Sequence, residues 1–240
     1  MKVIYVINPL TDKGFEQMTM REIEPLVTAD VQLRVVSIDK GPASIECRYD
    51  EVIAAPYLVK KVEEIADKAD AIVVNCFGDV GVEAAREVTR VPVIGPGSTS
   101  MALAQLLGHN FSVVTVLSRL APLIEKIALE LGTTKLKSVR AVNMPVLELE
   151  DRKKTVKGLT QESIKAIEED GAQVIVLGCT GMAGSADQLK NELTVRGYDL
   201  PVLDPLIVTL RLARVLIEEG LTPSRLTYPP PPEKERTGID

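Results

Sequence analysis

The chain has 240 residues, 45% of them hydrophobic, so it is long enough to bury a core. Its formal net charge is −6 and it lacks a long basic run, which argues against a nucleic-acid partner and against an anionic membrane surface. MKVIYVINP breaks at Pro9 without a signal-peptide cleavage site, and three charged residues interrupt the apolar stretch 200–217, so we expect a cytosolic protein without a membrane span.

Cysteine and histidine usage limits the possible chemistry. Three cysteines without a secretory signal indicate a reducing compartment, where structural disulfides are not expected. One His and no CxxC or HxxxH pair leave no pattern for a zinc or iron site. We therefore predict no metal and expect the cysteines to act as free thiols.

Short β-branched runs alternate with helical stretches along the chain, a pattern typical of parallel sheets covered by helices on both faces. The predicted strands are residues 2–7, 31–38, 71–75, 91–94, 111–117, 138–147, 173–177 and 201–203. Apolar positions at helical spacing mark amphipathic helices around 156–167 and 206–217. Residues 229–240 hold four prolines and then mostly charged residues, which predicts a mobile tail.

The two halves of the sequence resemble each other. ADAIVVNCFGDVG at 69–81 matches GAQVIVLGCTGMAG at 171–184, and in each half a short strand opening at a proline follows. KVIYVINP at 2–9 likewise resembles FSVVTVLS at 111–118. The duplication predicts an α/β fold with two similar lobes that face each other across a cleft.

Cys76 and Cys179 occupy matching positions in the duplicated segments, at the carboxyl ends of predicted strands, where open parallel sheets bind ligands. Each is expected to precede a helix, whose N-terminus lowers a thiol pKa from about 8.5 toward neutrality. Inversion of a stereocentre through a carbanion needs a base on one face and an acid on the other, and two opposed thiols supply both. The alternative is that each is a small buried hydrophobe.

Other polar motifs are less specific. Cys47 has no counterpart in the second half and is expected to be dispensable, while the sole histidine, His109, is interpreted as a capping or surface residue. GPGSTS at 95–100 contains Gly97 and Ser98 and follows a strand, so it is either an anion-binding loop or a plain turn. It lacks the third glycine of GxGxxG, and no phosphate-binding GxxxxGK[ST] occurs.

Polar residues also follow two of the predicted strands. Asp79 either caps the next helix or polarises an N–H group of a ligand. Asn8 and Thr11 either reach the cleft or form a turn around Pro9.

Taken together, these motifs resemble those of the aspartate/glutamate/hydantoin racemase superfamily, and most of all its hydantoin racemase branch, which includes allantoin racemases. The matching pieces run nearly end to end: INP at 7–9, GPASIE at 41–46, NCFGD at 75–79, PVIG at 92–95, LGCTGMA at 177–183 and VLDP at 202–205.

The resemblance implies a cofactor-independent racemase with two pseudosymmetric lobes, each a parallel four-stranded sheet flanked by helices. Residues 1–97 and 206–228 would form the lobe that carries Cys76, and residues 98–205 the lobe that carries Cys179. The implied partner is a small 5-substituted hydantoin, and a homo-oligomer is expected.

The resemblance also implies catalytic roles for Cys76 and Cys179, with the carbonyl oxygens of the substrate held by backbone N–H groups. The expected substrate-binding residues are Asn8, Phe77, Gly78, Asp79, Gly97, Ser98, Thr180 and Gly181. Such preorganised donors would stabilise the enolate formed when the ring carbon loses its proton.

Three departures from the family pattern border the expected cleft. Leu10-Thr11 stands where Asn-Thr or Asn-Ser is usual, Val80 stands where Pro is usual, and GPGSTS replaces GIGEAS. The side group of the substrate therefore stays open. Phe77-Gly78 after the first cysteine favours a neutral ring over aspartate or glutamate.

Alternatives remain at this point. A racemase or isomerase of allantoin, aspartate, glutamate or maleate would share the fold, as would an arylmalonate-type decarboxylase. A noncatalytic small-molecule binding module is the alternative outside enzymes.

Overall fold

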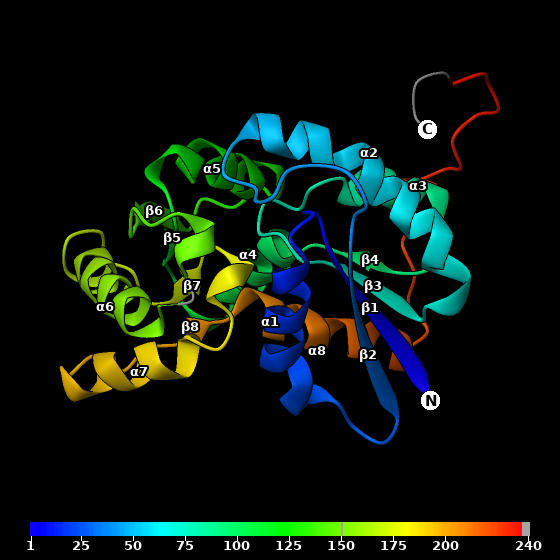
Figure 1. The fold of residues 1–240 in the computed structure, drawn as a ribbon. Coiled ribbons are helices and arrows are strands. Elements are labelled where there is room, and N and C mark those ends of the chain that lie inside the picture. Colours follow the sequence, from blue (N-terminus) through cyan, green and yellow to red (C-terminus); the bar gives the residue numbers. More distant parts are fainter. Residues whose placement is uncertain (150, 237–240) are drawn as a thin grey trace.

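The computed structural model describes residues 1–149 and 151–236 and shows two parallel four-stranded sheets (Figure 1). The first sheet has the order β2-β1-β3-β4, with β1 at Lys2–Asn8, β2 at Val31–Ser37, β3 at Ala71–Val74 and β4 at Val93–Ile94. The second has the order β6-β5-β7-β8, with β5 at Phe111–Thr115, β6 at Leu136–Ala141, β7 at Ile175–Leu177 and β8 at Val202–Leu203. The predicted fold class is confirmed.

Both sheets repeat the same strand order when strands are counted within each half. In the first, Ile4 of β1 pairs with Leu33 of β2 and Ala71 of β3; in the second, Val113 of β5 pairs with Val176 of β7. The central strands β3, β5 and β7 are buried on both faces, and accordingly β3 and β7 are continuously apolar, while β5 adds Ser112 and Thr115 to three apolar residues.

One predicted strand is too long. Residues 138–147 were expected to be extended throughout, but β6 ends at Ala141 and a 3-10 helix occupies Val146–Glu148. Asn143 has a φ of 54°, and Pro145 has no N–H to give to a ladder, so the chain turns here.

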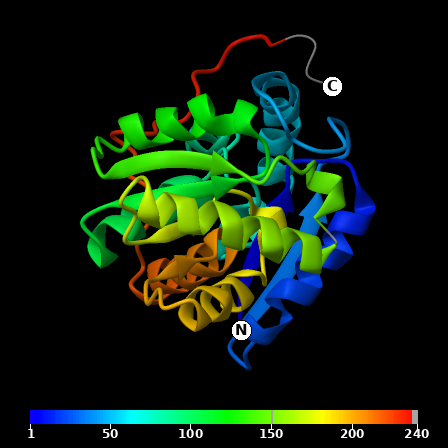
Figure 2. The same cartoon turned by 90° about the vertical axis from the view of Figure 1, so that its left-hand side faces the viewer.

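Eight α-helices are found within the described residues. They are α1 at Lys13–Ile23, α2 at Arg48–Ile65, α3 at Val82–Val88, α4 at Pro96–Leu107, α5 at Ala121–Glu130, α6 at Arg152–Glu168, α7 at Ala186–Val195 and α8 at Pro205–Glu218. Figure 2 shows α5 on one side of the second sheet and α6 and α7 on the other. This matches the core, in which Val113 packs with Ile124 of α5 while Val114 packs with Leu159 of α6.

The last helix, α8, belongs by its packing to the first sheet. Asp204 starts it by accepting hydrogen bonds from the N–H groups of Leu206 and Ile207. Leu206 and Leu210 then pack in one cluster with Ile4 of β1. We propose that α8 completes the first lobe, as the expected boundaries have it.

After α8, Arg225 and Tyr228 contact α3 through hydrogen bonds with Arg86. Residues 229–236 contain no helix or strand, and 237–240, the rest of the predicted mobile tail, lie outside the described residues. No helix in the described part of the chain has the length and apolar character that a membrane crossing requires.

Candidate active site

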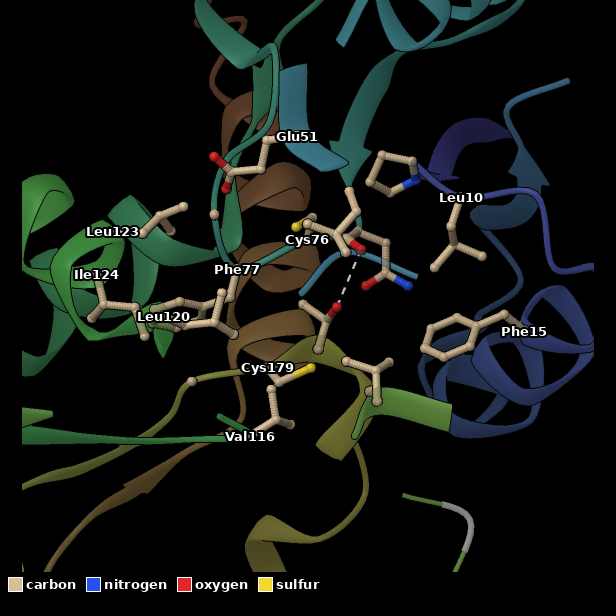
Figure 3. Close-up of a pocket in the computed structure, with 18 residues that line it drawn as sticks. Leu10, Phe15, Glu51, Cys76, Phe77, Val116, Leu120, Leu123, Ile124 and Cys179 are labelled. Carbon is tan, nitrogen blue, oxygen red and sulfur yellow. Dashed lines mark hydrogen bonds between the residues drawn. The ribbon is translucent and has the colours of Figure 1, made fainter. Parts of the chain in front are cut away.

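A cavity lies where the carboxyl ends of strands from both sheets meet (Figure 3). It encloses about 560 Å³ of empty space, part of it open to solvent. Its lining comprises Pro9, Leu10, Phe15, Ile45, Glu51, Asn75, Cys76, Phe77, Gly78, Val116, Leu120, Leu123, Ile124, Val146, Gly178, Cys179, Thr180 and Gly181. Both halves of the chain contribute, at the place where open parallel sheets bind ligands.

Cys76 and Cys179 both line this cavity. Cys76 lies two residues after the end of β3, and Cys179 lies two residues after the end of β7, so the duplicated strands present the thiols from equivalent positions. Both are free and partly exposed, and in Figure 3 the two sulfurs lie on walls built from different halves of the chain. The structure thus brings together the two cysteines that the sequence singles out.

The turns after the cysteines differ from the expectation. No α-helix starts directly after either residue: α3 begins at Val82, and Cys179 is followed by a 3-10 helix at Thr180–Met182. The expected lowering of the thiol pKa by a helix dipole therefore lacks its source.

The surroundings of the two cysteines raise the thiol pKa values instead of lowering them. Burial raises the pKa of the Cys179 thiol to about 11, with Glu46 adding to the rise and the N–H groups of Gly181 and Met182 opposing it. Burial likewise raises the pKa of Cys76, above that of Cys179, and the charges of Glu51 and Asp79 act in the same direction. The expectation of thiol pKa values near neutrality is wrong for the ligand-free protein, in which both groups rest as thiols.

Backbone N–H groups of the two turns divide into three kinds. The Asp79 N–H is used internally, since it donates to the carbonyl of Cys76 at 3.0 Å. Those of Gly78 and Gly181 face the sulfurs and favour their thiolate forms. Those of Phe77 and Thr180 have no hydrogen-bond partner among the described residues and are available to a carbonyl oxygen of a ligand.

Asp79, Gly97 and Ser98 lie outside the cavity lining, contrary to the expectation. The Asp79 carboxylate accepts hydrogen bonds from the N–H groups of Gly97 and Ser98, both at 2.8 Å, and so caps α4. The amides that might bind an anion are thus occupied by a protein carboxylate. A Cβ on Gly97 would lie 2.1 Å from the carbonyl oxygen of Phe77, so this glycine allows α4 to pack against the Cys76 turn.

Asn8 also lies behind the wall rather than in it. It is fully buried, and its Oδ1 accepts a hydrogen bond from Nδ2 of Asn75 at 2.8 Å. Asn75 also donates to Thr19 at 3.2 Å, and it is Asn75 that reaches the cavity. The polar residue at the end of β1 supports the neighbouring strand instead of a ligand.

Most of the cavity wall could not be predicted from the sequence. Outside the cysteine turns, its apolar part comes from five different segments, namely Pro9, Leu10 and Phe15, Ile45, Val116, Leu120 to Ile124, and Val146. Nothing local in these segments distinguishes cavity-lining from core-forming apolar residues.

Glu51 was also not predicted to line the site, although its position on an apolar helix face indicates an unusual buried carboxylate. It shares a helical face with Ala54, Leu58 and Val62, where an apolar residue would be expected. Its Oε2 accepts a hydrogen bond from Nη1 of Arg48 at 2.8 Å. Burial raises the pKa of this carboxyl, and Arg48 opposes that rise.

The part of the chain that the structure describes contains no group of three or more His, Cys, Asp or Glu side chains placed to hold a metal ion. The polar groups in the cavity wall are thiols, one carboxylate, one amide, one hydroxyl and backbone N–H groups. They are suited to proton transfer and to hydrogen bonding of a small ligand.

Comparison with known proteins agrees with this architecture. The model of the family described as Asp/Glu/Hydantoin racemase matches residues 4–213. A hydantoin racemase from Pseudomonas sp. (strain NS671) is 38% identical over 239 residues, covering 98% of this chain and 94% of that protein. The hydantoin racemase from Paenarthrobacter aurescens is 33% identical, covering 97% and 98%. The solved structure of allantoin racemase from Klebsiella pneumoniae superposes with a TM-score of 0.91 at 31% identity, covering 99% of this chain and 97% of that one. The chain therefore belongs to the Asp/Glu/hydantoin racemase family.

Proposed function

We propose that this protein is a cofactor-independent racemase of 5-monosubstituted hydantoins that works by two-base proton transfer between Cys76 and Cys179. Its family and its relatives make it an isomerase of the racemase type. The observation that carries the proposal is the placement of two thiols at equivalent positions on walls of one cavity from different halves of the chain.

In the proposed reaction, one cysteine acts as thiolate and removes the proton from C5 of the ring. The electron pair moves into the C4 carbonyl, which becomes an enolate oxygen. The other cysteine, still a thiol, then gives its proton to the opposite face of C5. The N–H groups of Phe77 and Thr180 are the free donors that would hold the enolate oxygen, and one such donor can contribute about 10²-fold in rate.

The apolar lining supports an apolar side group at C5. Burying the ureido group of allantoin against Leu10, Phe15 and Val146 would leave amide hydrogens without acceptors, at about 1–3 kcal/mol for each unmatched group. No cationic side chain belongs to the described lining, so the free carboxylate of aspartate or glutamate would lack a partner. We therefore favour aliphatic and aromatic hydantoins over both.

The direct test is circular dichroism of single-enantiomer 5-benzyl- and 5-isopropylhydantoin in D₂O under reducing conditions. The signal of either enantiomer should decay to zero, with one deuterium gained at C5 for each inversion. Allantoin and L-aspartate serve as comparison substrates and should decay more slowly. An unchanged signal for every hydantoin would contradict the proposal.

Replacing Cys76 or Cys179 by Ser should reduce racemisation at least about 10³-fold, because a hydroxyl is a much weaker acid and base than a thiol near neutral pH. The matched control is Cys47→Ser. Cys47 lies at the start of α2, outside the cavity lining, and its replacement should leave the rate unchanged. A Cys76 or Cys179 variant that racemises as fast as wild type would rule out the two-base mechanism.

A further inference from the structure

Glu51 holds a position in the cavity that the proposed proton transfer does not use. It projects from the first turn of α2 and is only 7% exposed. Among the described residues that line the cavity, it carries the one charged side chain, the two thiols aside. A buried carboxylate is costly unless something pairs with it, so its place in an apolar wall calls for a hydrogen-bond donor.

The carboxylate is held at one oxygen and open at the other. Oε2 accepts the hydrogen bond from Arg48, whereas Oε1 has no hydrogen-bond partner among the described residues. Oε1 lies over Gly78, where a Cβ would come within 2.3 Å of it. Gly78 is two residues after Cys76, so the missing side chain lets the carboxylate approach the catalytic turn. Figure 3 shows Glu51 on the Cys76 side of the cavity.

A hydantoin ring carries the hydrogen-bond donors that Oε1 of Glu51 lacks in the protein. The ring carries two N–H donors, N1–H and N3–H, and both must find acceptors when the ring is buried. The hydroxyl hydrogen of Thr180 is already donated to the carbonyl of Asn75, and the free N–H groups of Phe77 and Thr180 are donors. Two side-chain oxygens of the described lining have no hydrogen-bond partner, Oδ1 of Asn75 and Oε1 of Glu51. Of the two, only the carboxylate of Glu51 is charged, which makes it the stronger acceptor for a ring N–H.

We propose, resting on the hydantoin racemase function above, that Oε1 of Glu51 accepts the hydrogen bond from N1–H of the substrate ring. N1 is the better match because the enolate charge develops on the oxygen at C4. N3 is bonded directly to C4, so a carboxylate bound at N3 would lie closer to that charge. At N1 the carboxylate selects rings with an N–H next to the stereocentre.

The proposal is tested by exchanging N1–H for an oxygen atom. 5-Benzyl-2,4-oxazolidinedione has oxygen at that ring position and keeps N3–H and the acidic carbon. We measure kcat/KM for racemisation of this compound and of 5-benzylhydantoin by wild type and by Glu51→Gln. The ratio of kcat/KM for the hydantoin to that for the oxazolidinedione is compared between wild type and variant. The difference in intrinsic acidity between the two rings cancels in this comparison.

In the wild type, the ring oxygen would face a carboxylate oxygen, whereas the side-chain amide introduced by Glu51→Gln can donate a hydrogen bond to it. The hydantoin-to-oxazolidinedione ratio should fall about 10- to 100-fold in Glu51→Gln, as expected for one hydrogen bond to a charged group. Glu83→Gln is the matched control, because Glu83 is an exposed residue of α3 outside the cavity, and its ratio should equal the wild-type ratio.

A second variant keeps the test independent of the folding of Glu51→Gln. Arg48→Met removes the exposed anchor of Oε2, and its ratio should fall severalfold in the same direction. Wild-type ratios in both variants would overturn the proposal for Glu51 while leaving the racemase function in place. If wild type racemises neither ring, the proposed function itself fails, and the two outcomes are thereby distinguished.

Discussion

At the scale of single residues, the feature that governs catalysis is that both cysteines are neutral thiols in a mostly apolar cavity. A thiol is a useful base only after it loses its proton, and removal from water penalises the thiolate. Cys179 has two N–H groups favouring its thiolate and one acidic neighbour, whereas Cys76 has one N–H group and two acidic side chains nearby. Cys179 should therefore lose its proton first, and Cys76 should rest as the acid.

The raised pKa of the thiols predicts the pH dependence of racemisation. The active free enzyme needs one thiolate, and with the pKa of Cys179 raised to about 11 the thiolate fraction grows as pH rises toward that value. We expect kcat/KM to increase about tenfold per pH unit between about pH 6 and pH 8, in both directions of inversion. The measurement is a pH profile of initial circular dichroism rates for each enantiomer. A plateau that begins below about pH 7 would contradict a resting thiol pair.

At the scale of elements, the two cysteine turns are joined directly. The hydroxyl of Thr180, the residue after Cys179, donates to the carbonyl of Asn75, the residue before Cys76, at 3.2 Å. Asn75 is in turn held by Asn8 and Thr19 within a buried network. This hydrogen bond crosses between the halves of the molecule and joins the two turns that carry the thiols (Figure 3).

Replacing Thr180 by Val tests this connection. The change keeps the shape of the side chain but removes the donor, so the thiols should move relative to the ring and kcat should fall about 10- to 100-fold in both directions. KM should change little, because the apolar wall is intact. Thr180→Ser restores the donor and should restore most of kcat. Wild-type kcat in Thr180→Val, or equal losses in the Val and Ser variants, would contradict a positioning role for the hydroxyl.

At the scale of the whole molecule, contacts between residues distant in sequence join the two halves of the chain. Oε1 of Glu46 accepts a hydrogen bond from the N–H of Val146 at 2.9 Å, next to the lining residue Ile45. Arg152 forms an ion pair with Glu22 of α1. Of the two contacts, the hydrogen bond between Glu46 and Val146 is the one at the cavity, since Val146 belongs to its lining.

The difference between local sequence signals and contacts made only in the folded chain explains what the sequence could predict. The strands, their order of appearance and the paired cysteines were predictable, because apolar runs and internal repeats are local signals. Phe15 and Val146 were not, because only tertiary packing places them beside Cys76 and Cys179. Asn8 shows the limit at a strand end, where a polar side chain can face the ligand or the neighbouring strand with the same sequence.

The segment that follows α8 gives a prediction at this scale. Arg225 donates to the carbonyls of Arg86 and Glu87, and Arg86 donates to the hydroxyl of Tyr228 while lying 5.3 Å from the centre of its ring. Described residues beyond Tyr228 make hydrogen bonds only among themselves. Deleting residues 229–240 should therefore leave the free energy of unfolding unchanged.

Deleting residues 223–240 removes Arg225 and Tyr228 as well, and should lower the free energy of unfolding by about 1–3 kcal/mol, since hydrogen bonds to charged groups contribute on that order. Urea denaturation of both truncated proteins, followed by far-ultraviolet circular dichroism, measures the difference. If the shorter deletion destabilises as much as the longer one, the folded unit extends past Tyr228. If neither does, the anchoring of this segment on α3 contributes nothing to stability, and the lobe ends with α8 itself.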